Sequence, residues 1–237
     1  MMERFSKPNY ALGLLGLAMA VIPLNDALIK IMSASVSLGQ VVAVRAMMSL
    51  ILVMLVSDGL RAMLNLSAPI FWQFVGRAIC LVVAMLLFFV SLGSLPLANV
   101  IAIFFVAPMI ITLLSVPLLG EKIGVHRLAS VSAGMIGVLV IIQPGGTDFQ
   151  KENLLVIGAA LSYALFQIWT RRLKADGSLS AMVAVQHLCY FVAGALMVAA
   201  NVAWPVPPTG NATVDFLMRG PVVMSSMDWL FVWICCL

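Results

Sequence analysis

Three polar residues interrupt a long apolar stretch near the start of the chain. Asn25, Asp26 and Lys30 lie within PLNDALIK, inside an otherwise apolar sequence that covers residues 10–31. Asp26 and Lys30 are four residues apart and therefore share one face of a helix. An amide, a carboxylate and an ammonium group in this arrangement can form ion pairs or bind a polar solute. The spacing predicts a polar site inside an otherwise apolar helix.

Further polar side chains recur in other apolar stretches. With the three above, the candidate path residues are Arg45, Arg77, Asn99, Tyr163, Gln167, Gln186 and His187. Structural interpretations remain open: Lys30 and Arg77 can extend toward a membrane surface, Tyr163 can pack, and His187 can be a neutral core histidine. We expect Asp26 and Arg45 to lie at equal depth and to form an ion pair.

Enzymatic chemistry is not indicated by the titratable residues. The two histidines, His126 and His187, are far apart, and no acid, base or nucleophile motif accompanies them. The four cysteines lack the spacing of metal ligands, and we interpret them as small apolar groups within or near helices. No catalytic residue, metal site or cofactor is therefore predicted.

The elements that carry the polar residues are apolar helices. Hydrophobic residues make up 63% of the 237-residue chain and charged residues 9%, and the mean hydropathy is +1.14. A helix of about 20 apolar residues crosses a hydrocarbon core ~30 Å thick. The sequence predicts an all-α membrane protein, a polytopic helical bundle. The expected spans are residues 10–32, 38–57, 70–91, 96–119, 125–143, 153–171 and 179–203, with a partial eighth from Asp228.

A cleaved signal peptide is the alternative for the first span, because MMERFSK is a basic start and AMA at 18–20 resembles a cleavage site. Apolar residues continue well beyond that point, and six more spans follow. Membrane insertion of the first span is therefore the preferred interpretation.

Basic residues between the spans predict the orientation of the chain. With the N-terminus in the cytoplasm, two basic residues fall outside, Lys151 and Arg219, and eight fall inside. The eight are Arg4, Lys7, Arg61, Lys122, Arg127, Arg171, Arg172 and Lys174. This distribution predicts a multi-pass protein of the cell (inner) membrane, embedded in the lipid bilayer. It also accounts for the net charge of +4, so a nucleic-acid partner is not expected.

The chain contains a weak internal repeat. Residues 16–30 align with 158–172, and VVAVR at 41–45 aligns with MVAVQ at 182–186, at offsets of 142 and 141. Five spans separate the copies, so the second copy starts from the opposite side of the membrane. We expect inverted five-helix repeats, residues 1–145 and an incomplete second unit, residues 146–237. A complete form would have ten helices, of which seven and part of an eighth are present.

The most specific motif is LPLANVIAIFFVAPMIITLLSVPLLGEKIG at residues 95–124, followed by GMIGVLVIIQPG at 134–145. Together they resemble the drug/metabolite transporter superfamily, in particular the EamA-type transporters. The resemblance covers the chain from Tyr10 onward. It departs from the family pattern because the second unit lacks its own version of this motif. The resemblance implies ten helices in inverted repeats around a central cavity, and transport by alternating access.

Two prolines are expected to bend helices of this bundle. Pro108 lies within the fourth span, and Pro23 lies three residues before Asp26 on the same side of the first. Each removes a backbone donor from its helix.

The function implied by the resemblance is that of a secondary transporter for a small metabolite. Lys30, Arg45 and Arg77 outnumber the single carboxylate of Asp26, which favours an anionic or zwitterionic substrate. The alternative is a fragment of an interrupted gene that does not transport by itself, or an assembly partner in the membrane. A homodimer is left open.

Overall fold

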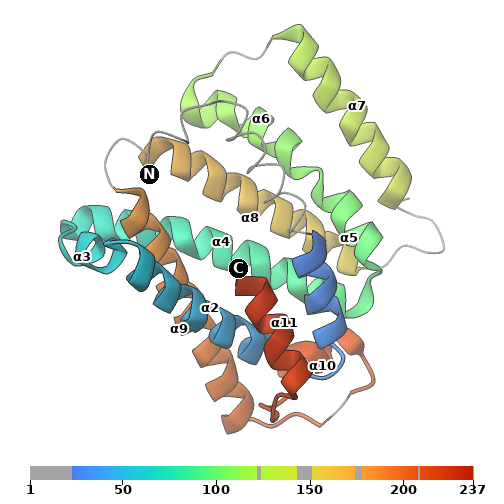
Figure 1. The fold of residues 1–237 in the computed structure, drawn as a ribbon. Coiled ribbons are helices and arrows are strands. Elements are labelled where there is room, and N and C mark those ends of the chain that lie inside the picture. Colours follow the sequence, from blue (N-terminus) through green and yellow to red (C-terminus); the bar gives the residue numbers. More distant parts are fainter. Residues whose placement is uncertain (1–22, 122–123, 143–150, 174–177, 208, 237) are drawn as a thin grey trace, which may run out of the picture.

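The computed structural model describes residues 23–121, 124–142, 151–173, 178–207 and 209–236. All regular structure within these ranges is helical, and residues 23–32 form the first described helix. The helices that follow are α2 (Leu38–Val56), α3 (Gly59–Leu64), α4 (Ala68–Ser94), α5 (Leu97–Phe104), α6 (Ala107–Leu119), α7 (Val125–Ile142), α8 (Glu152–Leu173), α9 (Leu179–Ala203), α10 (Ala212–Met218) and α11 (Ser226–Cys236) (Figure 1).

Among the described residues, five segments are long and apolar enough to cross a membrane. They are Leu38–Val56, Ala68–Ser94, Leu97–Leu119, Glu152–Leu173 and Leu179–Ala203. These bounds lie within a few residues of the predicted spans, so the prediction of an all-α, multi-pass membrane protein is confirmed. The helix predicted at 125–143 is α7, whose apolar part is Leu128–Gly137. Residues 10–22 of the first predicted span lie outside the described residues.

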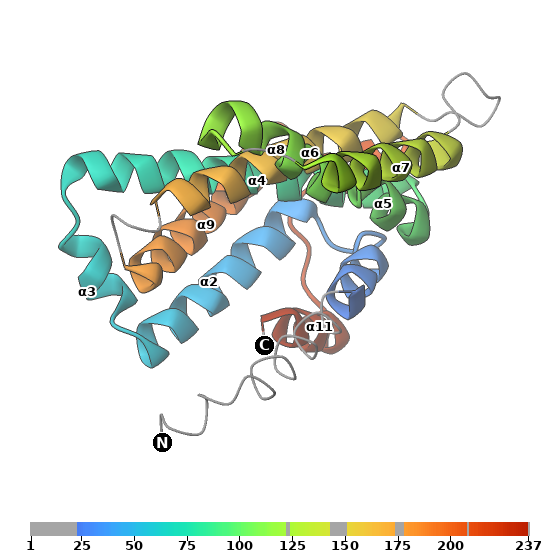
Figure 2. The ribbon, with the colours of Figure 1, turned by 90° about the horizontal axis from the view of Figure 1, so that it is seen from above.

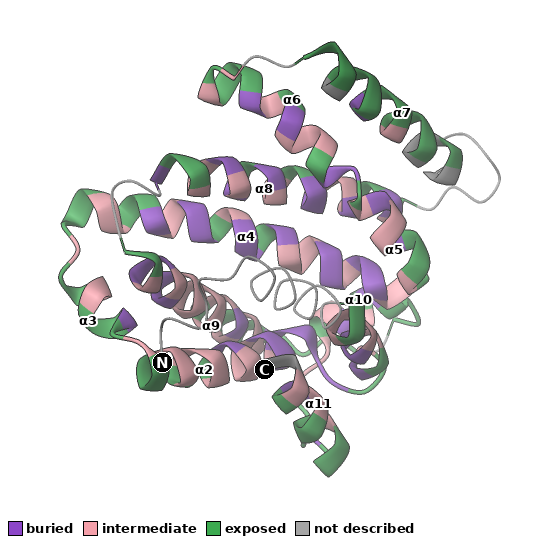
Figure 3. Ribbon diagram, turned by 45° about the horizontal axis from the view of Figure 1, so that its top comes forward, coloured by how far each residue is buried: buried purple, intermediate pink, exposed green. Residues whose placement is uncertain are grey.

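The bundle is formed by helices that are distant in the sequence. α2 packs mainly against α9, and α4 packs against both α8 and α9. α5 and α6 pack on α8, while the main neighbours of α7 are α5 and α6, at the edge of the molecule (Figures 1 and 2). Most described residues of α7 are exposed (Figure 3). An apolar helix with few protein neighbours is suited to contact with lipid.

The largest buried cluster joins α4, α5 and α8. Its members include Leu92, Ile103 and Val156, which are almost completely inaccessible. The Phe88 ring packs edge-on against Phe104, with centroids 5.1 Å apart. Aromatic pairs of this kind contribute about 0.5–1.5 kcal/mol beyond their buried area. This cluster fixes α4, which forms one wall of the cavity described below.

The fourth predicted span is divided in two just before Pro108. α5 ends at Phe104, Phe105 and Val106 form a turn, and α6 begins at Ala107. Pro108 has no N–H to donate to the carbonyl four residues earlier, which explains an interruption at this point. Pro23 is the first described residue of its helix, so the segment in which it would produce a bend lies outside the described residues.

α2 and α9 cross so closely that their backbones are almost in contact. A methyl group on Gly194 would lie 2.5 Å from the backbone nitrogen of Ala43, and one on Gly39 would lie 2.8 Å from the Cβ of Met197. Real Cβ atoms do not approach a backbone nitrogen so closely, so the crossing requires glycine at position 194. Small residues allow membrane helices to pack at this distance.

Candidate functional site

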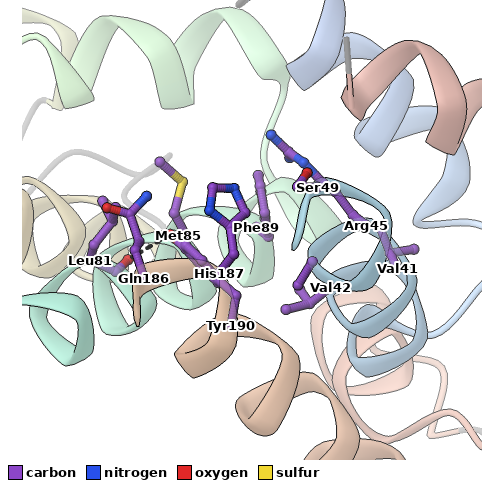
Figure 4. Close-up of a pocket in the computed structure, with 11 residues that line it drawn as sticks. Val41, Val42, Arg45, Ser49, Leu81, Met85, Phe89, Gln186, His187 and Tyr190 are labelled. Carbon is purple, nitrogen blue, oxygen red and sulfur yellow. Dashed lines mark hydrogen bonds between the residues drawn. The ribbon is translucent and has the colours of Figure 1, made fainter. Parts of the chain in front are cut away.

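A cavity of about 160 Å³ lies between α2, α4 and α9 (Figure 4). Its polar lining comes from two helices, with Arg45 and Ser49 on α2 and Gln186, His187 and Tyr190 on α9. Its apolar lining consists of Val41, Val42, Ala46, Leu81, Met85 and Phe89. A mainly apolar cavity with a few convergent polar groups is the usual form of a small-molecule site.

The two helices that carry the polar lining begin at opposite ends of the bundle. The Ser37 side chain caps α2 by accepting a hydrogen bond from the backbone N–H of Gln40, and Ser178 caps α9 in the same way from Ala181. Arg45 and Gln186 each follow their cap by eight residues, about 12 Å along a helix. The caps therefore place both side chains well inside the bundle.

Arg45 connects the cavity to the first helix. Its Nη1 donates a hydrogen bond to Oδ1 of Asn25 at 3.3 Å. No ion pair within 4 Å joins Asp26 to Arg45 among the described residues. The structure therefore has an Asn25–Arg45 contact where the sequence predicted Asp26–Arg45. Neighbouring helix residues point about 100° apart, so an error of one position changes which side chain faces α2.

Two side chains of the cavity are held by backbone carbonyls. Nδ1 of His187 lies 2.9 Å from the carbonyl oxygen of Val183, and the hydroxyl of Tyr190 donates to the carbonyl oxygen of Leu81 at 3.2 Å. A carbonyl oxygen only accepts, so Nδ1 carries the hydrogen of the neutral imidazole ring and Nε2 is then an acceptor.

Arg77 is buried and does not extend to a surface. Only 4% of the residue is exposed, and its guanidinium carbon lies 4.4 Å from the ring centroid of Phe166. Nε donates to the Thr170 hydroxyl at 2.7 Å, and Nη2 donates to Oε1 of Gln186 at 3.4 Å. Nη1 has no hydrogen-bond partner among the described residues. Arg77 thus joins α4 to α8 and α9 and reaches the cavity through Gln186.

Lys30 binds the end of a helix rather than the cavity. Its Nζ donates to the carbonyl oxygens of Leu92 and Leu95, the latter at 3.1 Å. These carbonyls belong to the C-terminal turn and cap of α4, where a cation is stabilised by the helix dipole. The ammonium group is therefore a structural tie between the first helix and α4.

Three other candidates lie outside the cavity lining. Asn99 is exposed in the first turn of α5. Gln167 donates through Nε2 to the Tyr163 hydroxyl at 2.6 Å, and the Tyr163 ring packs against Phe104 at 5.4 Å. This arrangement agrees with the packing interpretation of Tyr163.

The sequence did not single out Ser49, Tyr190 or the apolar wall from α4. The repeat contains a signal for the first two, since an offset of 141 places Ser49 on Tyr190, Arg45 on Gln186 and Ala46 on His187. All six residues line the cavity. Leu81, Met85 and Phe89 carry no comparable signal, because apolar residues occupy most of α4.

Residues 10–143 match the EamA-like transporter family. The chain belongs to this family. The family comprises transporters and not enzymes, in agreement with the interpretation of the sequence.

Curated relatives include riboflavin transporters. The chain is 30% identical to one from Vibrio cholerae over 132 residues, which are 56% of this chain and 43% of the relative. It is 27% identical to one from Rhizobium johnstonii over 150 residues, 63% of this chain and 49% of the relative. An S-adenosylmethionine uptake transporter of Rickettsia prowazekii is 30% identical over 88 residues, 37% of this chain and 30% of the relative. The chain spans about half the length of the riboflavin transporters that it matches. No solved structure gives a significant match.

Proposed function

We propose that the cavity between α2, α4 and α9 binds the substrate of a secondary transporter for a small metabolite. The observation that carries this proposal is the meeting of Arg45 from α2 with Gln186 and His187 from α9 around one cavity. Polar groups within membrane helices are costly, and an apolar bundle does not need them in order to fold. Membership of a transporter family gives the cavity its proposed role.

The helix contacts support two inverted units, residues 1–145 and 146–237. In this scheme the helix at 23–32, α2 and α4 correspond to α8, α9 and α11. The packing of α4 on α8 and α9 then has its counterpart in α11, which packs on α2 and, through Val232, shares a buried cluster with Met32 (Figure 2).

The short helices α3 and α10 correspond to each other in the same scheme. α3 connects the second and third helices of the first unit and packs on α9, while α10 occupies the corresponding place in the second unit and contacts α2. The cavity lies between α2 and α9, which this symmetry exchanges. A site at the interface between two inverted units is the arrangement found in many alternating-access transporters.

The charge of the cavity supports a substrate rich in acceptor atoms. Arg45 lines it and Arg77 lies directly behind Gln186, whereas Lys30 is bound by backbone carbonyls. The anionic or zwitterionic class predicted from the sequence fits this balance. The named relatives make riboflavin and S-adenosylmethionine the first compounds to test.

We propose the orientation predicted from the sequence, in the inner membrane with the N-terminus in the cytoplasm. α3 and α10 lie at opposite ends of the bundle (Figure 1). Arg61, Arg171 and Arg172 belong to the α3 end and Arg219 to the α10 end, which makes the α3 end cytoplasmic. Pairing of two chains in the bilayer remains a prediction.

The test combines binding with transport. The chain is reconstituted in nanodiscs and in liposomes, and binding and uptake are measured for riboflavin, S-adenosylmethionine and a panel of carboxylates. We expect at least one compound to bind, and Arg45→Gln to weaken its binding about tenfold through the loss of a charged donor. Uptake above protein-free liposomes would establish transport by this chain, and binding without uptake would favour the assembly-partner alternative. Absence of binding across the panel would contradict the proposal.

A further inference from the structure

We infer that the cavity recognises the edge of a cyclic imide, in which a ring N–H stands between two carbonyl groups. This inference rests on the proposed function, because it takes the cavity as the substrate site. It assigns three roles to side chains that line the cavity: Arg45 donates, His187 accepts and Gln186 donates. In Figure 4 the His187 ring lies between the Gln186 and Arg45 side chains.

The donor roles of Arg45 and Gln186 follow from the chemistry of the guanidinium group and from one hydrogen bond of Gln186. A guanidinium group has no acceptor, so Arg45 can only donate to a ligand. Arg77 also has only donors, so the Gln186 atom that it contacts at 3.4 Å is the amide oxygen. The amide nitrogen of Gln186 is therefore the end that a ligand can use. Thr170 and Phe166 hold Arg77 in place, which makes Arg77 a positioning residue for Gln186.

The acceptor between them is Nε2 of His187. Nδ1 lies 2.9 Å from the carbonyl oxygen of Val183 and carries the ring hydrogen in the neutral state. Tyr190 uses its hydroxyl hydrogen on the carbonyl oxygen of Leu81 and so does not compete as a second donor beside His187. Nε2 is thus the ring acceptor to which a ligand N–H can donate, and the hydroxyl oxygens of Ser49 and Tyr190 are the other side-chain acceptors in the lining.

An imide edge matches this order of donor, acceptor and donor more closely than a carboxylate or an adenine edge does while His187 is neutral. Its two carbonyl oxygens would accept from Arg45 and Gln186, and its N–H would donate to His187. A carboxylate could accept from both donors, but it would turn a lone pair toward Nε2 of the neutral histidine. The amino group of an adenine edge would face a donor. Leu81, Met85 and Phe89 of α4 provide an apolar wall for the face of the ring.

Methylation of the imide nitrogen tests this assignment. The probes are lumiflavin, which carries the imide, and 3-methyllumiflavin, in which a methyl group replaces the N–H. Binding to the chain in nanodiscs is measured by fluorescence, with empty nanodiscs as background. We expect lumiflavin to bind at least tenfold more tightly than its methylated form. Equal affinities would overturn the inference.

Variants separate recognition from structural damage. His187→Phe should weaken lumiflavin and bring the ratio between the two probes close to one, because the acceptor is lost. Gln186→Leu should weaken both probes and preserve their ratio. His126→Phe, at an exposed position of α7, is the matched control and should change neither affinity. A ratio that survives in His187→Phe would remove His187 from the assigned role, even if that variant lost stability.

Competition with uridine shows which kind of ring carries the imide. The wider panel of compounds separates failure of the imide assignment from failure of the proposed function. Competition by uridine would indicate that a pyrimidine ring suffices, whereas its failure to compete would indicate a larger flavin-type ring; both results agree with an imide site. If neither lumiflavin form binds while another compound of the panel does, the imide assignment is wrong and the transporter proposal stands. If nothing binds, both fail.

Discussion

The two ends of the bundle are held together by different kinds of polar contact. At the α10 end, side chains bind the backbone of segments distant in the sequence. The Gln40 amide donates to the carbonyl oxygen of Val222 at 2.7 Å and accepts from its N–H at 3.1 Å. Arg219 donates to the carbonyl oxygen of Ser33 at 3.4 Å, and Lys30 binds the end of α4. These contacts give partners to backbone groups at the ends of the first helix and α4, and in the connection between α10 and α11.

At the α3 end, the described ion pairs are exposed. Arg171 and Glu121 connect the ends of α8 and α6 at 3.5 Å, with side chains 50% and 38% exposed. Asp58 and Arg61 are 3.7 Å apart, and both side chains are 86% exposed. Such pairs contribute little because water screens them.

The difference indicates which end can open at low cost. The α10 end combines backbone-directed hydrogen bonds with the close crossing of α2 and α9 at Gly194. The α3 end has a buried apolar cluster around Phe74 and Met182, but its ion pairs are screened by water. Under the proposed orientation, the end with the backbone-directed hydrogen bonds is the outer one. Motion that admits a ligand is then expected at the cytoplasmic end.

The largest loss of stability is expected at the close crossing of α2 and α9, near the α10 end. Gly194→Val would place side-chain atoms against the backbone of Ala43, which cannot move without separating α2 from α9. Overpacking of this kind costs roughly 3 kcal/mol, and the thermal midpoint of unfolding in detergent should fall accordingly. Gly137→Val on α7 is the control, because open space surrounds that glycine. Equal losses in the two variants would show that the crossing is not tightly packed.

An intermediate effect is expected at the end of α4. Lys30→Met removes the ammonium group from the carbonyl oxygens of Leu92 and Leu95. Hydrogen bonds to a charged group contribute about 1.5–3 kcal/mol, so a loss of about 2 kcal/mol is predicted from detergent unfolding curves. Lys30→Arg keeps a donor and should recover most of it. Wild-type stability in Lys30→Met would reject the structural role of Lys30.

The smallest effect is expected at the α3 end. A double-mutant cycle of Glu121→Gln and Arg171→Gln should yield a coupling of about 0.2–1 kcal/mol, because exposed pairs are weak. The coupling should decrease further when the salt concentration rises from 0.05 to about 0.5 M, as the Debye length falls to a few ångströms. A coupling energy that exceeds the loss of stability in Lys30→Met and does not change with salt would reverse the comparison of the two ends.

The spans could be predicted because their signal is local. A run of apolar residues reports burial in lipid whatever its neighbours are, so the expected span at 179–203 agrees with α9 at Leu179–Ala203. α3 and α10 were missed because helices of six and seven residues have no run of that length. Their positions depend on packing against α9, α4 and α2, which no local pattern records.

Side-chain partners were harder to predict than helices. The sequence placed Arg45, Gln186 and His187 among the candidates because polar residues are rare in the spans, and these three line the cavity. It did not predict that Arg77 is buried, because Thr170 and Phe166 lie about 90 residues away and only tertiary structure brings them together. The ion pair expected between Asp26 and Arg45 was not found. Similar depth in the membrane does not determine how a helix is rotated about its own axis, and this rotation decides which side chain faces α2.

The helices differ in length, and this affects how the protein fits a bilayer. α4 has 27 residues and α2 has 19, which correspond to about 40 Å and about 28 Å of helix. A hydrocarbon core ~30 Å thick matches α2 without much tilt, but α4 must incline or protrude. Because α4 forms the apolar wall of the cavity, a change in bilayer thickness would alter the tilt of that wall relative to Arg45. Lipid chain length is therefore a variable that acts on the site without contacting it.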